Sequence, residues 1–269
     1  MQDNPIVSVL MTAYNRKKYI GQAIESVLSS TLTNYELIIV DDCSTDATIE
    51  IAEEYQKKDT RIKVYTNAKN LGDYHNRNKA ASYASGKYIK YVDSDDMIYK
   101  HTLQVMVDFM EGHPEVAYGV CSPRLSNAQP FPHIFLPMNA IRHHFFKEHF
   151  LGCGPTGTII RLANFMELNG FSGTRMIGDI EFGLRCASRY PVMILPPGLV
   201  FWREHGEQEI ALGIQNNMYE PLLNEFYDKF IQEVGPSIFS KKELLEMIKR
   251  EKKAKRMEAI RRRIRFLFK

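Results

Sequence analysis

The sequence predicts an α/β protein with a mostly parallel central sheet flanked by helices, followed by a helical extension at the C-terminus. Short β-rich segments alternate with helical patterns of about 10–15 residues over the first 120 residues, as they do in βαβ units. Polar clusters follow several of these strands, at the carboxyl ends where open parallel sheets bind ligands. The composition agrees with a globular chain, since 44% of the 269 residues are apolar and 25% are charged.

The first half of the chain contains the regular part of this pattern. Short apolar, β-branched segments predict strands at 6–11, 36–40, 62–65, 88–92 and 116–120. Apolar residues at helical spacing predict helices at 19–28, 74–85 and 101–111. A further helix is expected after residue 45, with Ser44 or Thr45 as its N-cap and Asp46 in its first turn.

The second half is less regular. A long passage that we expect to be irregular is marked by Pro123, Pro130, Pro132 and Pro137. Strands are then expected at 158–161, 192–195 and 199–203. Helices are expected at 141–150, at 162–168, from about 179, at 219–234 and at 240–266.

The net charge of +3 combines two different parts of the chain. Residues 241–269 hold 13 Lys and Arg against 4 Asp and Glu. The rest of the chain holds 22 Lys and Arg against 28 Asp and Glu. Apolar residues recur every three or four positions in this basic tail, which predicts a helix that binds an anionic membrane surface. A helix docked on the body, a dimerising helix and a solvated terminus are alternatives, and the oligomeric state stays open.

No secretion signal is visible at the N-terminus, and no apolar stretch reaches the roughly 18 residues that span a bilayer. We therefore expect a cytoplasmic protein, attached at most to the inner face of the cell membrane. The four cysteines are scattered without metal-ligand spacing, which argues against a zinc site or a disulfide framework.

Two acidic clusters follow neighbouring strands. Asp93, Asp95 and Asp96 fall within four residues, a crowding that favours a bound cation such as Mg²⁺ or Mn²⁺ shared with a diphosphate. Asp41 and Asp42 would accept hydrogen bonds from a base N–H or from ribose hydroxyls. For both clusters an ordinary acidic helix cap is the alternative. Neither GxGxxG nor GxxxxGK[ST] follows the first strand, which argues against dinucleotide-binding Rossmann proteins and P-loop NTPases.

Three segments in order resemble family 2 glycosyltransferases: Pro5–Arg16, Glu36–Asp46 and Gly86–Asp96, with Asn70-Leu71-Gly72 and Arg77-Asn78 between the last two. The resemblance is dense over about residues 5–110 and thinner to about 205. It implies a GT-A fold with a Rossmann-like mixed sheet, and transfer of one sugar from a nucleoside diphosphate donor with inversion. UDP is the expected nucleotide and Mn²⁺ or Mg²⁺ the expected cofactor. The "QxxRW" element of processive members is missing, which favours single addition.

The same resemblance implies roles for individual residues. It assigns donor binding to Thr12, Tyr14, Asp41, Asp42, Arg77 and Asp93. It assigns metal binding to Asp95 as the main ligand, with Asp93 and His205 beside it. His205 lies in an "R-x-H" element whose Arg203 would pair with phosphate; a structural role for this histidine is the alternative.

The segment Gly178–Arg185 resembles the family's catalytic "ED" segment. Gly178 stands where the family often has Glu, so only Asp179 is carried over as the general base, with Glu181 as a fallback. Asp179 would take the proton of the acceptor hydroxyl while the metal stabilises charge on the departing diphosphate. A simple helix cap is the alternative for Asp179.

On this interpretation residues 1–212 form the GT-A domain, with 1–120 binding the nucleotide sugar and 121–212 the acceptor. Residues 213–269 form a helical region with its basic amphipathic tail at 240–269. The expected acceptor is a glycan or a lipid-linked glycan of surface polysaccharide or glycolipid synthesis, and no nucleic acid is expected. A sugar nucleotidyltransferase is one alternative, although residues 12–16 lack its usual glycine-rich basic loop. A nucleic-acid-binding protein acting through the tail is the other.

Overall fold

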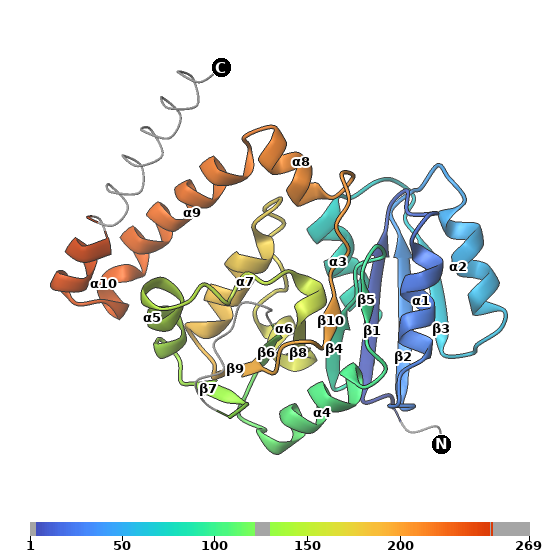
Figure 1. Ribbon diagram of the computed structural model, residues 1–269, viewed down its shortest axis with the longest axis horizontal. Helices are drawn as coiled ribbons and strands as arrows, with labels where there is room; N and C mark the ends of the chain where they lie inside the picture. The colour runs from blue at the N-terminus through green and yellow to red at the C-terminus, as the bar shows by residue number, and fades with distance from the viewer. Residues whose placement is uncertain (1–3, 122–129, 248, 250–269) are drawn as a thin grey trace. The chain divides into compact units, whose positions relative to one another are not determined.

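The computed structural model describes residues 4–121, 130–247 and 249 (Figure 1). The described chain forms two compact units, one up to Asn216 and one from Asn217 onward. The first unit holds a mixed sheet of eight strands with helices between them, and the second is helical. The fold class predicted from the sequence is therefore confirmed.

Strands and helices alternate along the beginning of the first unit (Figure 1). In chain order they are β1 (Val7–Ala13), α1 (Ile20–Leu28), β2 (Tyr35–Asp41), α2 (Thr48–Gln56), β3 (Ile62–Thr66), α3 (Asp73–Ala81), β4 (Tyr88–Tyr91), β5 (Met97–Ile98), α4 (Thr102–Gly112) and β6 (Tyr118–Cys121). The remaining elements are β7 (His133–Phe135), α5 (Asn139–Phe146), a short 3₁₀ turn (Pro155–Gly157), β8 (Thr158–Arg161), α6 (Leu162–Glu167), α7 (Gly178–Ala187), β9 (Val192–Leu195), β10 (Val200–Phe201) and α8 (Glu209–Gln215).

The large sheet has the strand order β3-β2-β1-β4-β8-β6-β9-β7. β1 pairs in parallel with both β2 and β4, so the direction of winding reverses beside β1. β8 runs antiparallel to β4 and β6, and β7 runs antiparallel to β9 at the edge. In sheets of this kind, ligands bind outside the carboxyl ends of the strands at the reversal.

The central strands are buried on both faces of the sheet. Every residue of β1 is buried, as in a strand covered on both faces. Val7, Val9 and Met11 belong to the hydrophobic cluster that also contains Ile24 of α1 and Met106 of α4. The intervening residues Ser8, Leu10 and Thr12 are buried on the opposite face, and Ser8 donates a hydrogen bond to Glu36 there.

A second, two-stranded sheet joins distant parts of the chain. β5 and β10 are antiparallel, with Ile98 opposite Val200 and Met97 opposite Phe201. β5 begins directly after Asp96, and β10 ends one residue before Trp202. The pairing of β5 with β10 therefore places the acidic turn beside the segment that carries the predicted "R-x-H" element. The strand predicted at 199–203 is shorter, because only these two residues pair.

The predicted N-caps of α2 are wrong. The helix begins at Thr48 after Ala47, and Asp46 Oδ1 accepts the hydrogen bond of the Thr48 N–H at 3.0 Å. Ser44 instead bonds to Asp41, donating from its own N–H to Oδ2 at 2.8 Å. The loop between β2 and α2 uses its side chains to close on itself, which delays the start of the helix.

Other differences lie in the second half. β7 falls in the proline-marked passage that we expect to be irregular, where it pairs with β9 and gains its order from that neighbour. α8 is a helix that the sequence pattern does not predict. α5 overlaps the helix predicted at 141–150 but ends at Phe146. Pro123 lies outside the described residues.

The second unit contains α9 (Tyr219–Glu233), α10 (Gly235–Ile238) and a helical segment over 241–247. α10 packs against α9. The helix predicted at 240–266 is observed over its first part, and residues 250–269 of the basic tail lie outside the described residues. Within the described chain, every helix is too short or too polar to cross a bilayer.

Candidate active site

The structure gathers the predicted residues at the carboxyl edge of the sheet. Thr12 lies at the end of β1, and Asp41 and Asp42 follow at the end of β2. Asp93 begins the acidic turn two residues after β4. β1 lies between β2 and β4, so all of these residues meet where the winding reverses.

Asp93 is bound by the buried side chain of Arg77. The Arg77 Nη1 donates to Asp93 Oδ1 at 2.6 Å, and its Nε donates to Asp73 Oδ1 at 2.8 Å. Thr156 fixes the backbone of the turn, since its Oγ1 accepts the Asp93 N–H at 3.0 Å. Burial raises the pKa of Asp73 to about 6 against the pull of Arg77, and the charges of Asp93 and Glu209 act in the same direction as burial.

Asp95 and His205 are brought together, as the metal assignment requires. Asp95 Oδ2 lies 3.1 Å from His205 Nε2 and 3.0 Å from Arg16 Nε. The His205 Nδ1 accepts the Glu207 N–H at 3.3 Å, so the neutral ring carries its proton on Nε2, toward Asp95. The ring stacks on Tyr19 with centroids 4.6 Å apart, which fixes its plane.

Arg203, in the segment that follows β10, fixes the acidic turn. Its Nε donates to the carbonyl oxygen of Asp95 at 2.8 Å, and its backbone N–H donates to Asp96 Oδ1 at 3.0 Å. Burial and the neighbouring Asp93 charge raise the pKa of Asp96 to about 7. The guanidinium thus supports the turn, and the crowded carboxylates around it favour a nearby cation.

Asp41 and Asp42 are buried and hold their own loops. The carboxylate of Asp42 accepts hydrogen bonds from the backbone N–H groups of Leu71 and Gly72 at 2.8 and 2.9 Å, and from Asn67 Nδ2 at 2.8 Å. Asp41 is bonded to Ser44. These bonds place the 67–72 loop against the end of β2.

Of the two remaining donor-binding candidates, Thr12 is buried, whereas Tyr14 is 46% exposed at this edge. The edge therefore offers an accessible flat ring beside buried polar groups, an arrangement on which a nucleobase can stack.

Asp179 lies in the first turn of α7 and is half-buried. Its Oδ1 accepts a hydrogen bond from the Tyr74 hydroxyl at 3.1 Å, and its Oδ2 accepts the Gly154 N–H at 3.1 Å. Burial raises the pKa of Asp179, and these bonds oppose that rise. Tyr74 is also adjacent to Arg77, whose guanidinium lies 5.9 Å from the ring centre, so contacts link Asp179 to Asp93.

Glu181, the fallback base, is engaged elsewhere. Both of its carboxylate oxygens are bound by Arg185, at 2.8 and 3.0 Å. Gly178, which stands where the family often has Glu, faces the Tyr74 ring, and a Cβ there would lie 2.9 Å from three ring atoms.

Sequence reasoning passed over four residues that contact the predicted groups: Arg16, Asp73, Tyr74 and Thr156. The signal for the second and third was their position directly after Asn70-Leu71-Gly72 and before Arg77.

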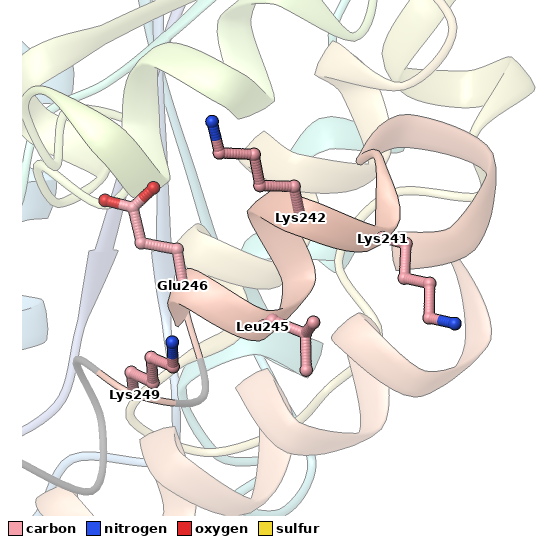
Figure 2. Close-up of a pocket in the computed structure, with 5 residues that line it drawn as sticks. All are labelled: Lys241, Lys242, Leu245, Glu246 and Lys249. Carbon is pink, nitrogen blue, oxygen red and sulfur yellow. The ribbon is translucent and has the colours of Figure 1, made fainter.

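The second unit offers a surface hollow that holds none of these residues (Figure 2). It is lined by side chains of one helical segment: Lys241, Lys242, Leu245, Glu246 and Lys249. Side chains of a single helix do not converge on a ligand, so the rim of the sheet remains the candidate site.

The rim fits a divalent cation that keeps most of its ligands from phosphate and water. Asp95 and His205 place one carboxylate oxygen and one imidazole nitrogen 3.1 Å apart, and Mn²⁺ accepts both donor types. To bind an ion through Nε2, the His205 ring would carry its proton on Nδ1 and give up the Glu207 N–H. Asp93 is directed to Arg77 instead. Among the described residues no group of three or more His, Cys, Asp or Glu side chains could hold an ion. A site with two protein ligands suits an ion that arrives with a diphosphate.

A mixed, mostly parallel sheet with carboxylates at its reversal point defines an α/β protein whose candidate ligand site lies at that edge. The sequence model described as "Glycosyl transferase family 2" matches residues 8–168. The chain belongs to this family, as the motifs of its first half predict.

Among curated relatives, the chain is 43% identical over 106 residues to a putative teichuronic acid biosynthesis glycosyltransferase, TuaG, of Bacillus subtilis. That alignment covers 39% of this chain and 42% of the relative. The chain thus matches less than half the length of the first curated relatives.

Solved structures with the same fold include glycosyltransferases. Staphylococcus aureus TarS 1–349 in complex with UDP-GlcNAc has a TM-score of 0.63 at 23% identity, covering 84% of this chain and 73% of that one. A mannosyltransferase of Pyrobaculum calidifontis, in complex with GDP-Man and Mn²⁺, has a TM-score of 0.58 at 15% identity. It covers 88% of this chain and 72% of the other. These likenesses confirm the GT-A fold.

Proposed function

We propose that this chain is a metal-dependent, inverting glycosyltransferase that moves one sugar from a nucleoside diphosphate sugar to an acceptor hydroxyl. The observation that carries the proposal is the division of carboxylates at one edge of the sheet. Asp95, on the acidic turn, contacts His205. Asp179 is held separately by hydrogen bonds from Tyr74 and Gly154. The first pair suits a cation beside a diphosphate, and the isolated carboxylate suits a base.

In the proposed reaction, Asp179 accepts the proton of the acceptor hydroxyl as its oxygen attacks the anomeric carbon. The bond from that carbon to the diphosphate oxygen breaks in the same step, so the configuration inverts. Mn²⁺ or Mg²⁺, held by Asp95 and His205, would supply positive charge to the departing diphosphate. Asp93 stays fixed by Arg77 and is proposed to face the ribose.

The donor is proposed to be a UDP-sugar. TarS, which shares the fold, was solved with UDP-GlcNAc, and the mannosyltransferase with GDP-Man and Mn²⁺. Tyr14 is proposed to stack on the base, because it is an exposed aromatic residue that directly follows β1. Thr12, Asp41 and Asp42 are proposed to line the nucleoside site, the two aspartates chiefly by shaping its loops.

The acceptor is proposed to be a glycan or lipid-linked glycan of a surface polysaccharide, since the name of TuaG places that relative in teichuronic acid synthesis. Attachment of the basic tail to the inner face of the membrane would bring the site to such an acceptor. Residues 1–212 are proposed as the catalytic domain, with the acceptor bound by 121–212.

The test of the reaction is product analysis with a panel of UDP- and GDP-sugars, in Mn²⁺, in Mg²⁺ and after chelation. We expect release of a nucleoside diphosphate that needs the metal, and NMR of the early product should show the anomer opposite to the donor. In a parallel assay with UTP or GTP and a sugar 1-phosphate, pyrophosphate release would indicate a nucleotidyltransferase and contradict the proposal.

The membrane proposal is tested by neutralising the tail in the full chain, as Arg261→Gln, Arg262→Gln and Arg263→Gln together. We expect weaker sedimentation with vesicles containing anionic lipid, and unchanged behaviour with neutral vesicles. The matched control replaces Lys57, Lys58 and Lys69 by Gln on the body. Retained vesicle binding, or RNA binding that the tail variant abolishes, would contradict this part.

A further inference from the structure

Tyr74 of α3 makes two hydrogen bonds to Asp179, which lies more than a hundred residues further along the chain. Its hydroxyl donates to Asp179 Oδ1 at 3.1 Å and accepts the Asp179 backbone N–H at 3.1 Å. The phenol uses its hydrogen toward the carboxylate and a lone pair toward the backbone. This pattern suits a neutral tyrosine facing an ionised carboxylate.

The second carboxylate oxygen is fixed by a different element. Asp179 Oδ2 accepts the Gly154 N–H, which comes from the turn before β8, at 3.1 Å. Each oxygen thus has a donor from outside α7, so the plane of the carboxylate is defined by two parts of the fold. Hydrogen bonds to the charged form lower a carboxyl pKa and oppose the effect of burial.

The Tyr74 ring also fixes the start of α7. Gly178, the residue before Asp179, faces the ring, and a Cβ there would lie 2.9 Å from its Cδ1, Cδ2 and Cε1 atoms. Gly178 does not have a positive φ, so the ring and not the backbone conformation excludes a side chain. Hydroxyl and ring therefore act on the same turn of helix.

We infer that Tyr74 is a positioning residue for the general base: it orients the Asp179 carboxylate and keeps it ionised inside the protein. The inference rests on the proposed role of Asp179. Asp73 and Arg77 are the charged groups that face Tyr74. The thiol of Cys153 and the phenol of Tyr118 are the titratable groups that face Asp179.

The kinetic test compares Tyr74→Phe with the wild-type protein. We expect kcat to fall tenfold to a hundredfold, with the KM of the donor changed less than twofold. The acid limb of the pH profile should move to higher pH by about one unit, since the lost hydrogen bond raises the pKa of Asp179. An unshifted limb would overturn the inference, whatever the loss of kcat.

The matched control is Tyr35→Phe. Tyr35 is buried at the start of β2, away from the carboxyl edge, and its hydroxyl donates one hydrogen bond to the Val27 carbonyl at 3.3 Å. Removing this hydroxyl should leave kcat and the pH profile unchanged. A shift of the acid limb in the control as well would also overturn the inference.

A second test needs no substrate and so separates this inference from the proposed function. It measures the melting temperatures of the wild-type protein, Tyr74→Phe, Asp179→Asn and the double variant at pH 5 and pH 8. We expect the effects to be non-additive, and the coupling to be larger at pH 8, where more Asp179 is ionised. Additive shifts at both pH values would overturn the inference. Strong coupling in a protein that releases no nucleoside diphosphate would contradict the proposed function alone.

Discussion

The two edges of the central sheet both hold carboxylates, but the pKa is lowered at one edge and raised at the other. At the amino edge, burial alone would raise the pKa of Glu36, yet bonds from Lys63, Ser8 and Ser85 outweigh burial and lower it. The Ser8 hydroxyl donates at 2.6 Å, the Lys63 ammonium at 2.7 Å and the Ser85 hydroxyl at 2.7 Å. The charged form of Glu36 is therefore the form that stabilises the fold.

At the carboxyl edge the balance is reversed. Burial raises the pKa of Asp179 in spite of its two donors, and burial with nearby negative charge raises that of Asp73 to about 6. Carboxylates kept in such surroundings lower stability and mark sites where chemistry needs them. The comparison indicates that the amino edge serves folding and the carboxyl edge serves function.

The largest effect is expected at the carboxyl edge. Asp179→Asn should lower turnover by about 10²- to 10⁴-fold, since it removes the proposed base. The melting temperature should stay equal or rise, because a desolvated charge is removed. Nucleoside diphosphate release and thermal unfolding measure the two effects. A loss of stability with normal turnover would reverse the comparison.

The same variant tests the pH dependence. The pKa of Asp179 is raised in the folded state, so folded protein binds more protons than unfolded protein between the ordinary and the raised value. Stability falls as pH rises through that window. Asp179→Asn should remove this part of the pH dependence, and an unchanged stability profile would contradict the assignment.

A smaller effect, on stability alone, is expected at the amino edge. Glu36→Gln leaves Ser8, Ser85 and Lys63 without a charged acceptor and should cost about 1–3 kcal/mol of unfolding free energy. The kcat of the folded protein should not change. Because the folded pKa of Glu36 is lowered, its stabilisation is present above the ordinary value and is lost as pH falls through the folded value. Urea unfolding at neutral and acidic pH measures both.

The smallest effect is expected for Lys63→Met. The Lys63 side chain is 48% exposed, so solvent screens its pairing with Glu36. The expected loss is about 0.2–1 kcal/mol. A loss equal to that of Glu36→Gln would show that the ammonium, and not the serine hydroxyls, determines the ionisation of Glu36.

The end of β4 and the acidic turn after it could be predicted from sequence, because a short β-rich segment is followed directly by three aspartates. The approach of His205 to Asp95 could not be derived from periodicity. It depends on β5 and β10, whose two-residue lengths are too short to give a pattern. The family resemblance supplied that residue.

Other contacts were out of reach for physical reasons. An aspartate after a strand can cap a helix, bind a ligand or hold a loop, and the sequence is the same in each case. The sequence alone therefore could not show that Asp42 accepts the backbone N–H groups of Leu71 and Gly72. Tyr74 gave no signal of its own, since its partner Asp179 is adjacent only in the folded chain. β7 is ordered by pairing with β9, which a local pattern does not record.

The proposed reaction depends on a cation that Asp95 and His205 hold beside the departing diphosphate. The most direct measurement is thermal unfolding of the wild-type protein and Asp95→Asn with UDP or GDP, with and without Mn²⁺. The wild-type protein should gain about 5–10 °C at a hundredfold excess over Kd only when nucleotide and Mn²⁺ are both present, and the variant should gain little. An equal gain in the variant, or a full gain without Mn²⁺, would contradict the claim.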